Sequence, residues 1–591
     1  MPRTVADALV ERLRTWQVPR VFGYAGDGID PMLAALRRAG DPEYIQPRHE
    51  EMAAFMASGH AKYTGSPGVC LATHGPGAAH LVNGLYDAKL DRRPVVALVG
   101  QVVSSALGSG YLQEIDLHAL FKDVCGQYLQ TVFRPEQLPM LLDNAMRTAI
   151  ATSTPTCLIL PHDVQQMDAV DEPPQEHGVV PSAAVSGRPY VEPTEDELRR
   201  AADVLQQGSR VALLVGRGAA GAADEIAQVV ELLGAGVAVS LLGKPLLDER
   251  TSWHTGVMGH LGTTASAELM SGCDTLLIVG SNDPWTEFYP APGQARAVQI
   301  DVDGRVVGSK YPVEVALVGD AATTLRALLP LLRRTTDRAW SRQVERDVER
   351  WRKIADERAN APANPVNPEL VVRSLSPHLP SDVLVAVDVG SATYWYARHL
   401  TLPPAAPAHI SSYLASMGCA LPYALAAKLD SPDRPVLALA GDGAMQMNGL
   451  LELITVADRW RYWTDPRFVV VVLNNRDLNE VTWEQREMEG DPRYDASQRV
   501  PDFPYARYAE LLGLTGIRIE KPDQIVPAWQ QAFTADRPVV VEAVVDANTP
   551  LLPPKLPSAK LDKIHHAIDQ EASQAARPPI LRQRATENYL D

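Results

Sequence analysis

An acid between two glycines and a pair of asparagines follow two apolar segments in the last third of the chain. Asp442 stands in a Gly-Asp-Gly triplet directly after the apolar run 435–440, and Asn474–Asn475 follow the run 468–473. Short apolar runs bounded by a proline or by turn residues are typical of buried strands. Because the carboxyl ends of parallel strands meet at one edge of a sheet, we expect the carboxylate and an amide oxygen to lie close together there.

These oxygen ligands suit magnesium, which prefers hard oxygens and keeps positions for water and phosphate. The glycines beside Asp442 allow a sharp turn and close backbone approach. A loop acid alone, or an Asn-Asn turn alone, would more commonly be an ordinary loop; both together, each after a strand, favour a site. The sequence therefore predicts a magnesium–diphosphate site at the carboxyl ends of parallel strands.

Length and composition limit the class of protein. A chain of 591 residues predicts several domains, and 46% hydrophobic with 21% charged residues is ordinary for a globular protein. A net charge of −17 argues against nucleic-acid binding. We see no apolar run long enough to span a membrane and no signal peptide, and five scattered cysteines indicate buried, reduced thiols. We expect a cytoplasmic protein.

Proline-rich breaks divide the chain into three units in which strands alternate with helices. This alternation predicts the α/β class, with three doubly wound parallel-sheet domains. The expected limits are 1–178, 190–340 and 362–548, followed by a tail at 549–591. We expect an irregular tail that is ordered by contact and too polar for a membrane-inserting helix.

Several segments carry a family resemblance. They are 45–57 with Arg-His-Glu, 73–87 with Gly-Pro-Gly and Asn-Gly-Leu, 108–114, 387–391, and the two motifs above. Over nearly its whole length the chain resembles the pyruvate oxidase / acetolactate synthase branch of thiamine diphosphate enzymes, most of all the quinone-linked pyruvate oxidase type. The resemblance implies a pyrimidine-binding, a central and a pyrophosphate-binding domain, assembled as a homodimer or homotetramer.

The resemblance assigns the catalytic role to Glu50. This acid would hydrogen-bond the aminopyrimidine ring of thiamine diphosphate and so promote removal of the thiazolium C2 proton, which is general acid–base work. Glu51 is the alternative, but helical geometry turns it about 100° away. Because the family's site spans two subunits, Glu50 of one chain would serve the diphosphate site of another.

The resemblance also assigns cofactor and metal ligands. Asp442 and Asn475 would bind magnesium by side chain and Asp477 by its backbone carbonyl, and Met417 would wedge between the cofactor's two rings. Backbone amides at strand and helix ends would approach the diphosphate. The positions assigned to thiamine diphosphate are Gly26, Gly75, Pro76, Asn83, Gln113, Gly390, Ser391, Ser416, Met417, Gly441, Gly443 and Ala444.

The central unit has a G-x-G-x-x-G loop at 216–221, directly after an apolar run. It is weak support for NAD, because the next run, 237–242, ends without a ribose-binding acid. The resemblance implies FAD instead, although Leu242 replaces the oxidases' arginine, and an empty central domain is the alternative. The implied flavin positions are Gly216, Gly218, Gly259, Ser281, Asp301 and Asp320, with the two aspartates on ribose and adenine.

Two departures from the family pattern fall in the expected substrate pocket. Leu112 replaces an aromatic residue, and Glu480 stands where the oxidases have a Leu-Gly-Phe ending. Because an unpaired buried carboxylate is costly, we expect Glu480 to meet Arg476 or Arg486, or to contact a polar substrate. The alternative is that Glu480 turns to solvent.

Three functions remain to be distinguished. The first is magnesium-dependent oxidative decarboxylation of pyruvate or a similar 2-oxo acid, with electrons leaving through FAD. The second is a non-oxidative carboligase or decarboxylase of the acetolactate synthase type. The third, a regulatory protein without turnover, is disfavoured by the intact Glu50 and Gly-Asp-Gly motif.

Overall fold

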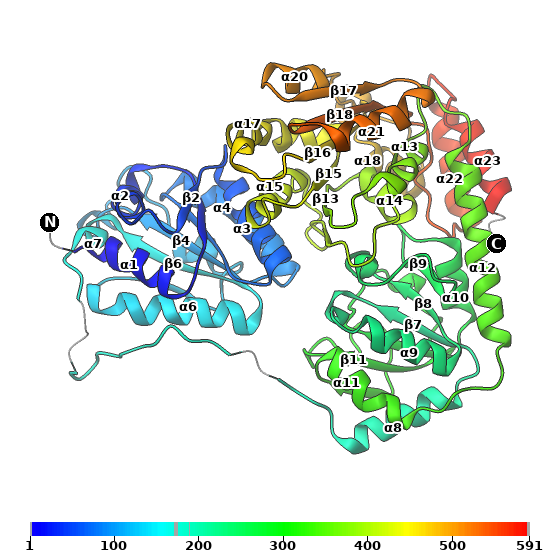
Figure 1. Cartoon of the computed structure of the whole chain (residues 1–591), viewed down its shortest axis with the longest axis horizontal. Coiled ribbons are helices and arrows are strands. Elements are labelled where there is room, and N and C mark those ends of the chain that lie inside the picture. Colours follow the sequence, from blue (N-terminus) through cyan, green and yellow to red (C-terminus); the bar gives the residue numbers. More distant parts are fainter. Residues whose placement is uncertain (1–2, 171–174, 188–189, 588–591) are drawn as a thin grey trace.

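The computed structural model describes residues 3–170, 175–187 and 190–587, which form three α/β domains and a helical tail (Figure 1). In each domain a parallel six-stranded sheet is interleaved with helices. Alternation of strands and helices in the sequence predicts this architecture. The expectation of three doubly wound parallel-sheet domains is confirmed.

The N-terminal domain comes first in the chain. Its strands are β1 Arg20–Gly23, β2 Glu43–Ile45, β3 Gly68–Ala72, β4 Val95–Gln101, β5 Leu129–Thr131 and β6 Pro155–Pro161. Its helices are α1 Val5–Thr15, α2 Asp30–Ala39, α3 Glu50–Thr64, α4 Pro76–Leu90, α5 Leu117–Phe121, α6 Leu138–Thr152 and α7 His162–Gln166. The sheet order is β2-β1-β3-β4-β6-β5, and β4 and β6 are buried along their whole length, as helices on both faces require.

The central domain follows. Its strands are β7 Val211–Val215, β8 Gly236–Val239, β9 His254–Val257, β10 Thr275–Val279, β11 Arg296–Asp301 and β12 Val315–Val318. Its helices are α8 Glu195–Gln207, α9 Ala223–Leu233, α10 Thr264–Gly272, α11 Ala321–Leu328 and α12 Ala339–Ala359. The sheet order is β12-β11-β10-β7-β8-β9.

The C-terminal domain carries the Gly-Asp-Gly and Asn-Asn motifs. Its strands are β13 Leu384–Val387, β14 Ala408–His409, β15 Val436–Gly441, β16 Phe468–Asn474, β17 Thr515–Ile519 and β18 Val539–Val544. Its helices are α13 Pro368–Leu375, α14 Ser391–His399, α15 Ala420–Asp430, α16 Asp442–Ala444, α17 Leu450–Arg459, α18 Asn479–Glu484, α19 Asp495–Gln498, α20 Tyr505–Leu511 and α21 Ile525–Thr534. The order is β14-β13-β15-β16-β18-β17, so β15 and β16 are neighbours as predicted.

Each sheet has a point where the strand order reverses. The chain leaves β1, β7 and β13 in one direction and returns on the other side at β3, β10 and β15 respectively. The loops that follow such a strand pair diverge, so ligands of open α/β sheets commonly bind there. All three reversal points in this chain are flanked by glycine-containing loops.

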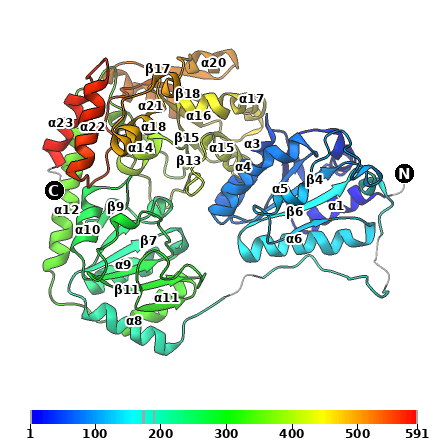
Figure 2. The same cartoon turned by 180° about the vertical axis from the view of Figure 1, so that it is seen from behind.

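The N-terminal and C-terminal domains share one apolar core. Figures 1 and 2, which view the chain from opposite sides, both place α3 and α4 between the N-terminal sheet and α15. The Phe55 ring meets the Tyr423 ring edge to face at 6.0 Å. Gly59 permits this approach, because a Cβ there would lie 3.1 Å from the Tyr423 Cα.

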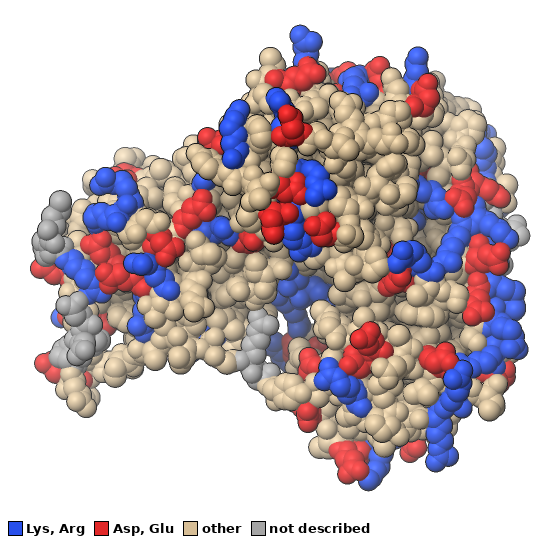
Figure 3. Space-filling view, viewed as in Figure 1, with Lys and Arg blue, Asp and Glu red and all other residues tan. Residues whose placement is uncertain are grey.

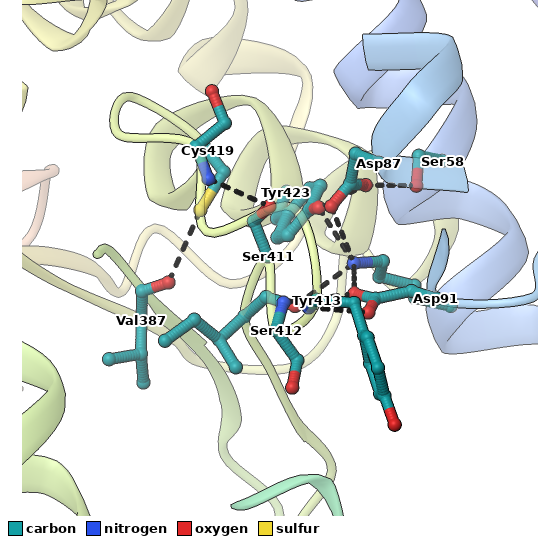
Figure 4. A network of polar contacts seen from close by, with 12 residues as sticks. Ser58, Asp87, Asp91, Val387, Ser411, Ser412, Tyr413, Cys419 and Tyr423 are labelled. Atoms are coloured by element: carbon teal, nitrogen blue, oxygen red, sulfur yellow. Dashed lines mark hydrogen bonds and ion pairs between the residues drawn. The ribbon is translucent and has the colours of Figure 1, made fainter. Parts of the chain in front are cut away.

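A buried ammonium group lies at the centre of this interface. The Lys62 Nζ, on α3, donates to Tyr423 Oη at 2.7 Å, to the Ile410 carbonyl at 2.9 Å and to the Asp91 carboxylate at 2.5 Å, with Asp87 at 3.2 Å. Figure 4 shows Asp87, Asp91 and Tyr423 converging. The Lys62 and Asp87 side chains are at most 1% exposed. An unpaired charge at this depth would be very costly, so these groups require one another.

The same cluster holds the segment that leads to Met417. The Asp91 carboxylate accepts hydrogen bonds from the backbone N–H groups of Ser412, at 3.1 Å, and Tyr413, at 3.2 Å. The Tyr423 hydroxyl donates to Asp87, which also accepts from Ser58. The interface therefore fixes both the helix that begins at Glu50 and the loop that precedes Met417.

The tail differs from the irregular segment that we expected. It contains α22, Ser558–Gln570, and α23, Arg577–Glu587. Leu561, Ile564 and Ile568 are buried in the core of the C-terminal domain, and their spacing is that of one helix face. This spacing is visible in the sequence, but the proline-rich stretch before it obscures the signal.

The surface shows mixed charge. In the face drawn in Figure 3, Lys and Arg are scattered among Asp and Glu rather than gathered into one basic area. Within the described ranges, no helix combines the length and apolar character needed to cross a bilayer.

The buried ammonium group yields a stability prediction. Lys62→Met should lower the free energy of unfolding by about 3–5 kcal/mol, because it leaves Asp87 and Asp91 buried without their cation. Denaturant unfolding of the purified variant measures this loss. The control is Lys89→Met, which breaks an ion pair whose Asp123 partner is 72% exposed and should cost less than about 1 kcal/mol. Equal losses in the two variants would show that the cluster does not hold the interface.

Candidate functional site

The reversal point of the C-terminal sheet is open. Gly390 follows β13 with φ +122° and caps α14, and Gly441 ends β15. A Cβ added at either glycine would meet nothing within 4 Å. Open space therefore borders each glycine, and α14 begins with Ser391 directly after Gly390.

Asp442 is a buried charged residue at this end of the sheet. It is only 2% exposed, and no basic side chain of the described residues lies within ion-pair distance of it. Its carboxylate accepts from the backbone N–H groups of Gly443, at 2.8 Å, and Arg476. Burial raises the pKa of Asp442 to about 7, although these backbone hydrogen bonds oppose the rise. A bound cation would supply the missing positive charge.

The Asn-Asn motif lies beside Asp442. Because the backbone N–H of Arg476 donates to Asp442, the loop after β16 is tied to the loop after β15. Asn475 Oδ1 accepts from the Asp477 N–H at 3.0 Å. The Asp477 carboxylate accepts from Arg493 Nε at 2.9 Å, so this side chain is engaged away from a metal role. The expected ligation by the Asp477 backbone carbonyl is compatible with that arrangement and stays a prediction.

Met417 lies over the Gly-Asp-Gly loop. A Cβ on Gly443 would approach Met417 Cε to 3.1 Å and Leu478 Cδ2 to 2.7 Å, so the glycine makes room for both side chains. Asp388 positions the Met417 segment, because its carboxylate accepts from the N–H groups of Gly418, at 2.8 Å, and Ala420, at 2.9 Å. The predicted neighbour Ala444 is buried within α16.

Glu50 begins α3, with His49 as the N-cap residue. Its side chain is 12% exposed, and Oε2 lies 3.0 Å from Nδ1 of His80. The junction before it is held by the C-terminal domain, because buried Glu452 accepts from the Arg48 N–H at 2.8 Å. The neighbouring Glu51 accepts from Asn83 and so points elsewhere, as the helical geometry predicts.

Asn83 connects the two halves of the candidate site. Its Nδ2 donates to Glu51 Oε1 at 2.6 Å and to Ser416 Oγ at 2.8 Å, and Ser416 directly precedes Met417. The helix that starts at Glu50 and the loop that carries Met417 are thus adjacent within this chain. That Glu50 serves the site of a second chain stays a prediction about the assembly.

The other predicted N-terminal positions gather around the loop after β3. A Cβ on Gly26 would come within 2.6 Å of Thr73, so the loops after β1 and β3 are in contact. Gly75 has φ +60°, and Pro76 begins α4. Gln113 reaches this turn, since its Cβ would lie 2.7 Å from a Cβ on Gly75. These residues lie together as expected.

The predicted flavin residues lie along one edge of the central sheet, but the reversal point there is closed. Gly216 and Gly218 pack directly against the Gly280–Ser281 backbone, where a Cβ would clash at 2.4 and 2.7 Å. These glycines therefore serve loop packing. Ser281 Oγ is the exception, since it is buried without a hydrogen-bond partner and could bind a ligand.

The remaining flavin positions already have protein contacts. Gly259, with φ +94°, has Trp285 where its Cβ would project. Asp301 accepts from the Asp303 N–H, and burial raises the pKa of Asp301. Asp320 caps α11 through the Thr323 N–H. Flavin binding at this edge stays a prediction, supported by the position of the residues and by the free Ser281 hydroxyl.

The C-terminal crevice fits a magnesium–diphosphate group better. It offers an uncompensated buried carboxylate, two glycines with open space and a helix N-terminus, which suits a cation and phosphate oxygens. Asn474 adds a buried Oδ1 without a hydrogen-bond partner. Asp442, Asn475 and Asp477 would hold the cation there.

Glu480 pairs with neither of the two arginines that we expected as its partners. Arg476 pairs with Asp502 at 3.1 Å, and Arg486 binds Glu571 through two hydrogen bonds. Among the described residues, no hydrogen bond or ion pair engages Glu480, so the predicted pairing with either arginine is wrong. Burial, and next the Glu484 charge, raise the pKa of Glu480 to about 7. Leu112, also expected in the pocket, is 77% exposed.

Sequence reasoning missed three supporting residues. Asp388 holds the Met417 loop, His80 contacts Glu50, and Glu452 supports the turn before Glu50. Asp388 stands in the matching segment 387–391, and His80 lies one helical turn before Asn83, so a sequence signal existed for both. Glu452 had none, because its role depends on contact between two domains.

The scan of family descriptions matches all three domains. The N-terminal thiamine pyrophosphate-binding domain matches residues 3–120, the central domain of the same enzymes 198–328, and the C-terminal thiamine pyrophosphate-binding domain 388–543.

Full-length relatives agree. A Bacillus subtilis protein, described provisionally as containing thiamine pyrophosphate, is 34% identical over 94% of this chain and 93% of its own. A pyruvate oxidase of Lactiplantibacillus plantarum is 29% identical over 98% and 92%. An acetolactate synthase large subunit of Corynebacterium glutamicum is 30% identical over 96% and 90%.

The protonation of Asp442 yields a pH prediction. Its pKa of about 7 means that the buried carboxyl must lose a proton before it binds a cation. Below pH 7, divalent-cation affinity should therefore fall by up to about tenfold per pH unit, and above pH 7 it should level off. Mn²⁺ titration followed by electron paramagnetic resonance measures this affinity, with Asp442→Asn as the control that binds no cation. An affinity that is constant between pH 5.5 and 8 would contradict the assignment.

Proposed function

Since the chain belongs to the thiamine pyrophosphate enzyme family that includes pyruvate oxidase and acetolactate synthase, we propose that it decarboxylates pyruvate or a similar 2-oxo acid oxidatively. In this proposal the enzyme depends on thiamine diphosphate and magnesium and passes electrons through FAD to an acceptor. The proposal also takes the active form to be a homodimer or homotetramer.

The observation that carries the proposal is that two acids, Glu50 and Asp442, stand in different surroundings at the two assigned halves of the cofactor site. Asp442 is buried beside Gly441, and none of the described basic side chains pairs with it. Glu50 begins α3. Asn83, on the adjacent helix α4, donates a hydrogen bond to Ser416 in the Met417 loop. One acid is placed to hold a cation and the other to exchange a proton, and their surroundings differ accordingly.

Different residues of the chain would bind the metal, face the phosphates and exchange the proton. When bound, thiamine diphosphate supplies a carbon nucleophile for the 2-oxo acid carbonyl and a sink for the electrons that decarboxylation leaves. Asp442 and Asn475 would hold the magnesium ion, and the N-terminus of α14 would face the phosphates. Glu50 would exchange a proton with the pyrimidine ring, and His80, 3.0 Å away, would orient the carboxylate.

A non-oxidative reaction is the second candidate. The closed reversal point of the central domain favours it, because Gly216 and Gly218 are used for loop packing. The pyruvate oxidase and acetolactate synthase relatives are also equally similar, at 29% and 30% identity. Bound flavin that bleaches on anaerobic addition of substrate supports oxidation, whereas turnover without flavin reduction supports a carboligase or decarboxylase.

Two exposed apolar side chains near the candidate site support assembly into an oligomer. Tyr111 is 57% and Leu112 77% exposed, and both directly precede Gln113, which contacts the Gly75 turn. Apolar side chains that are this exposed beside a candidate site are suited to cover by another subunit. Light scattering that gives a monomer mass together with full activity would overturn this part of the proposal.

Glu50 provides the decisive test of the function. Wild-type protein with thiamine diphosphate and magnesium should turn over at least one 2-oxo acid from a panel with an artificial electron acceptor. Glu50→Gln should keep cofactor binding but slow both turnover and exchange of the cofactor's C2 proton by about 10²–10⁴-fold. The matched control is Glu51→Gln, whose side chain accepts from Asn83 and lies 4.0 Å from His49 Nδ1, and which should cost much less. Wild-type exchange in Glu50→Gln would refute the assignment.

Glu480 predicts the substrate preference. Its partly buried carboxylate has no hydrogen-bond or ion-pair partner among the residues that the structure describes, so we expect weak activity on pyruvate and higher activity on a 2-oxo acid with a polar group. Glu480→Phe should shift the ratio of kcat/KM values toward pyruvate by about tenfold. The neighbouring exposed Val481, replaced by Ala, serves as the control. An unchanged substrate profile in Glu480→Phe would mean that Glu480 does not line the pocket.

A further inference from the structure

The tail is tied to the C-terminal domain through a buried ion pair. Glu571, at the end of α22, accepts from Arg486 Nε at 2.8 Å and from Arg486 Nη2 at 2.9 Å. The Arg486 side chain is 3% exposed and that of Glu571 is 11% exposed. A bidentate pair between a guanidinium and a carboxylate is strong and directional, so it fixes Glu571 in one place.

Glu571 also contacts the segment around Arg493, which supports the candidate metal loop, residues 475–478. Its Oε1 accepts from the backbone N–H of Arg493 at 3.0 Å. Arg493 in turn donates from Nε to the Asp477 carboxylate at 2.9 Å, and the Asp477 side chain is 2% exposed. A continuous chain of hydrogen bonds, which passes through the backbone of Arg493, therefore runs from the tail to the metal loop.

The residues after Arg493 lie against the same loop. Leu478 N–H donates to the Gln498 carbonyl at 2.8 Å, and Val500 N–H donates to the Arg476 carbonyl at 3.1 Å. The segment that begins at Arg493 thus contacts both the metal loop and the tail. A displacement of Arg493 would therefore alter its hydrogen bond to Asp477. Asp477 is one residue from Arg476, whose N–H binds Asp442.

We propose that Glu571 is a positioning residue for the cation site. It holds the backbone of Arg493, so that Arg493 occupies the Asp477 carboxylate and the loop 475–478 stays in the arrangement that faces Asp442. Groups that orient metal ligands from outside commonly change metal affinity by about 10–100-fold when they are removed. The inference rests on the proposed magnesium site.

Point variants test this without removing the tail. Glu571→Leu removes both the carboxylate that binds Arg486 and the acceptor of the Arg493 N–H, and Arg493→Met removes the contact with Asp477. Each should raise the dissociation constant of Mn²⁺ about tenfold, measured by electron paramagnetic resonance with thiamine diphosphate present. Because both act through one chain of contacts, the double variant should lose little more than either single variant. Arg493→Lys, which keeps a cation for Asp477, should restore most of the affinity.

The control is Asp569→Asn in the same tail helix. Asp569 pairs with Arg577 and is 52% exposed, so this variant breaks a tail ion pair that does not lead to the metal loop. It should bind Mn²⁺ as the wild type does. Wild-type affinity in Glu571→Leu, or an equal loss in Asp569→Asn, would overturn the inference. Failure of the wild-type protein to bind Mn²⁺ at all would instead overturn the proposed function with it.

Discussion

The structure depends on one ammonium group that is buried between two domains. Lys62 is 1% exposed on its side chain, and Asp87, Asp91, Tyr423 and a backbone carbonyl surround its ammonium group. Breaking such a pair by removing one partner is strongly destabilising. The cluster therefore requires α3 and α4 to pack against the segment before α15, and that packing creates the candidate site. The Asn83–Ser416 and Arg48–Glu452 hydrogen bonds add to this packing, and together these contacts keep the helix that begins at Glu50 beside the Met417 loop.

The three reversal points show how one architecture gives different capacity for ligands. All three lie between strands where ligands of such sheets bind, and all three carry glycines. In the central domain the glycines let two loops pack together, as the contacts of Gly216 and Gly218 show. In the C-terminal domain Gly390 and Gly441 leave open space beside an uncompensated acid. Whether a glycine motif can bind a cofactor thus depends less on its position in the sheet than on whether the space beside it is filled.

Much of the fold and part of the site could be predicted from the sequence. Apolar runs such as 468–473 identified buried strands, and the Gly-Asp-Gly and Asn-Asn motifs do lie on neighbouring strands, because local pattern determines both. The helices of the tail were missed because a proline-rich stretch obscures the spacing of Leu561, Ile564 and Ile568. The partners of Glu480 were predicted wrongly, since Arg486 is taken by Glu571, 85 residues away in the chain. Contacts at that separation depend on packing that a local pattern does not contain.

The central claim is that the start of α3, the Met417 loop and the metal loop form one binding site. Hydrogen–deuterium exchange of the backbone, with and without thiamine diphosphate and magnesium, tests it most directly. The account predicts that the ligands slow exchange together in 48–53, 412–420 and 474–478, and that Asp442→Asn abolishes the protection in all three. Protection confined to 474–478, with 48–53 and 412–420 unchanged, would contradict the account.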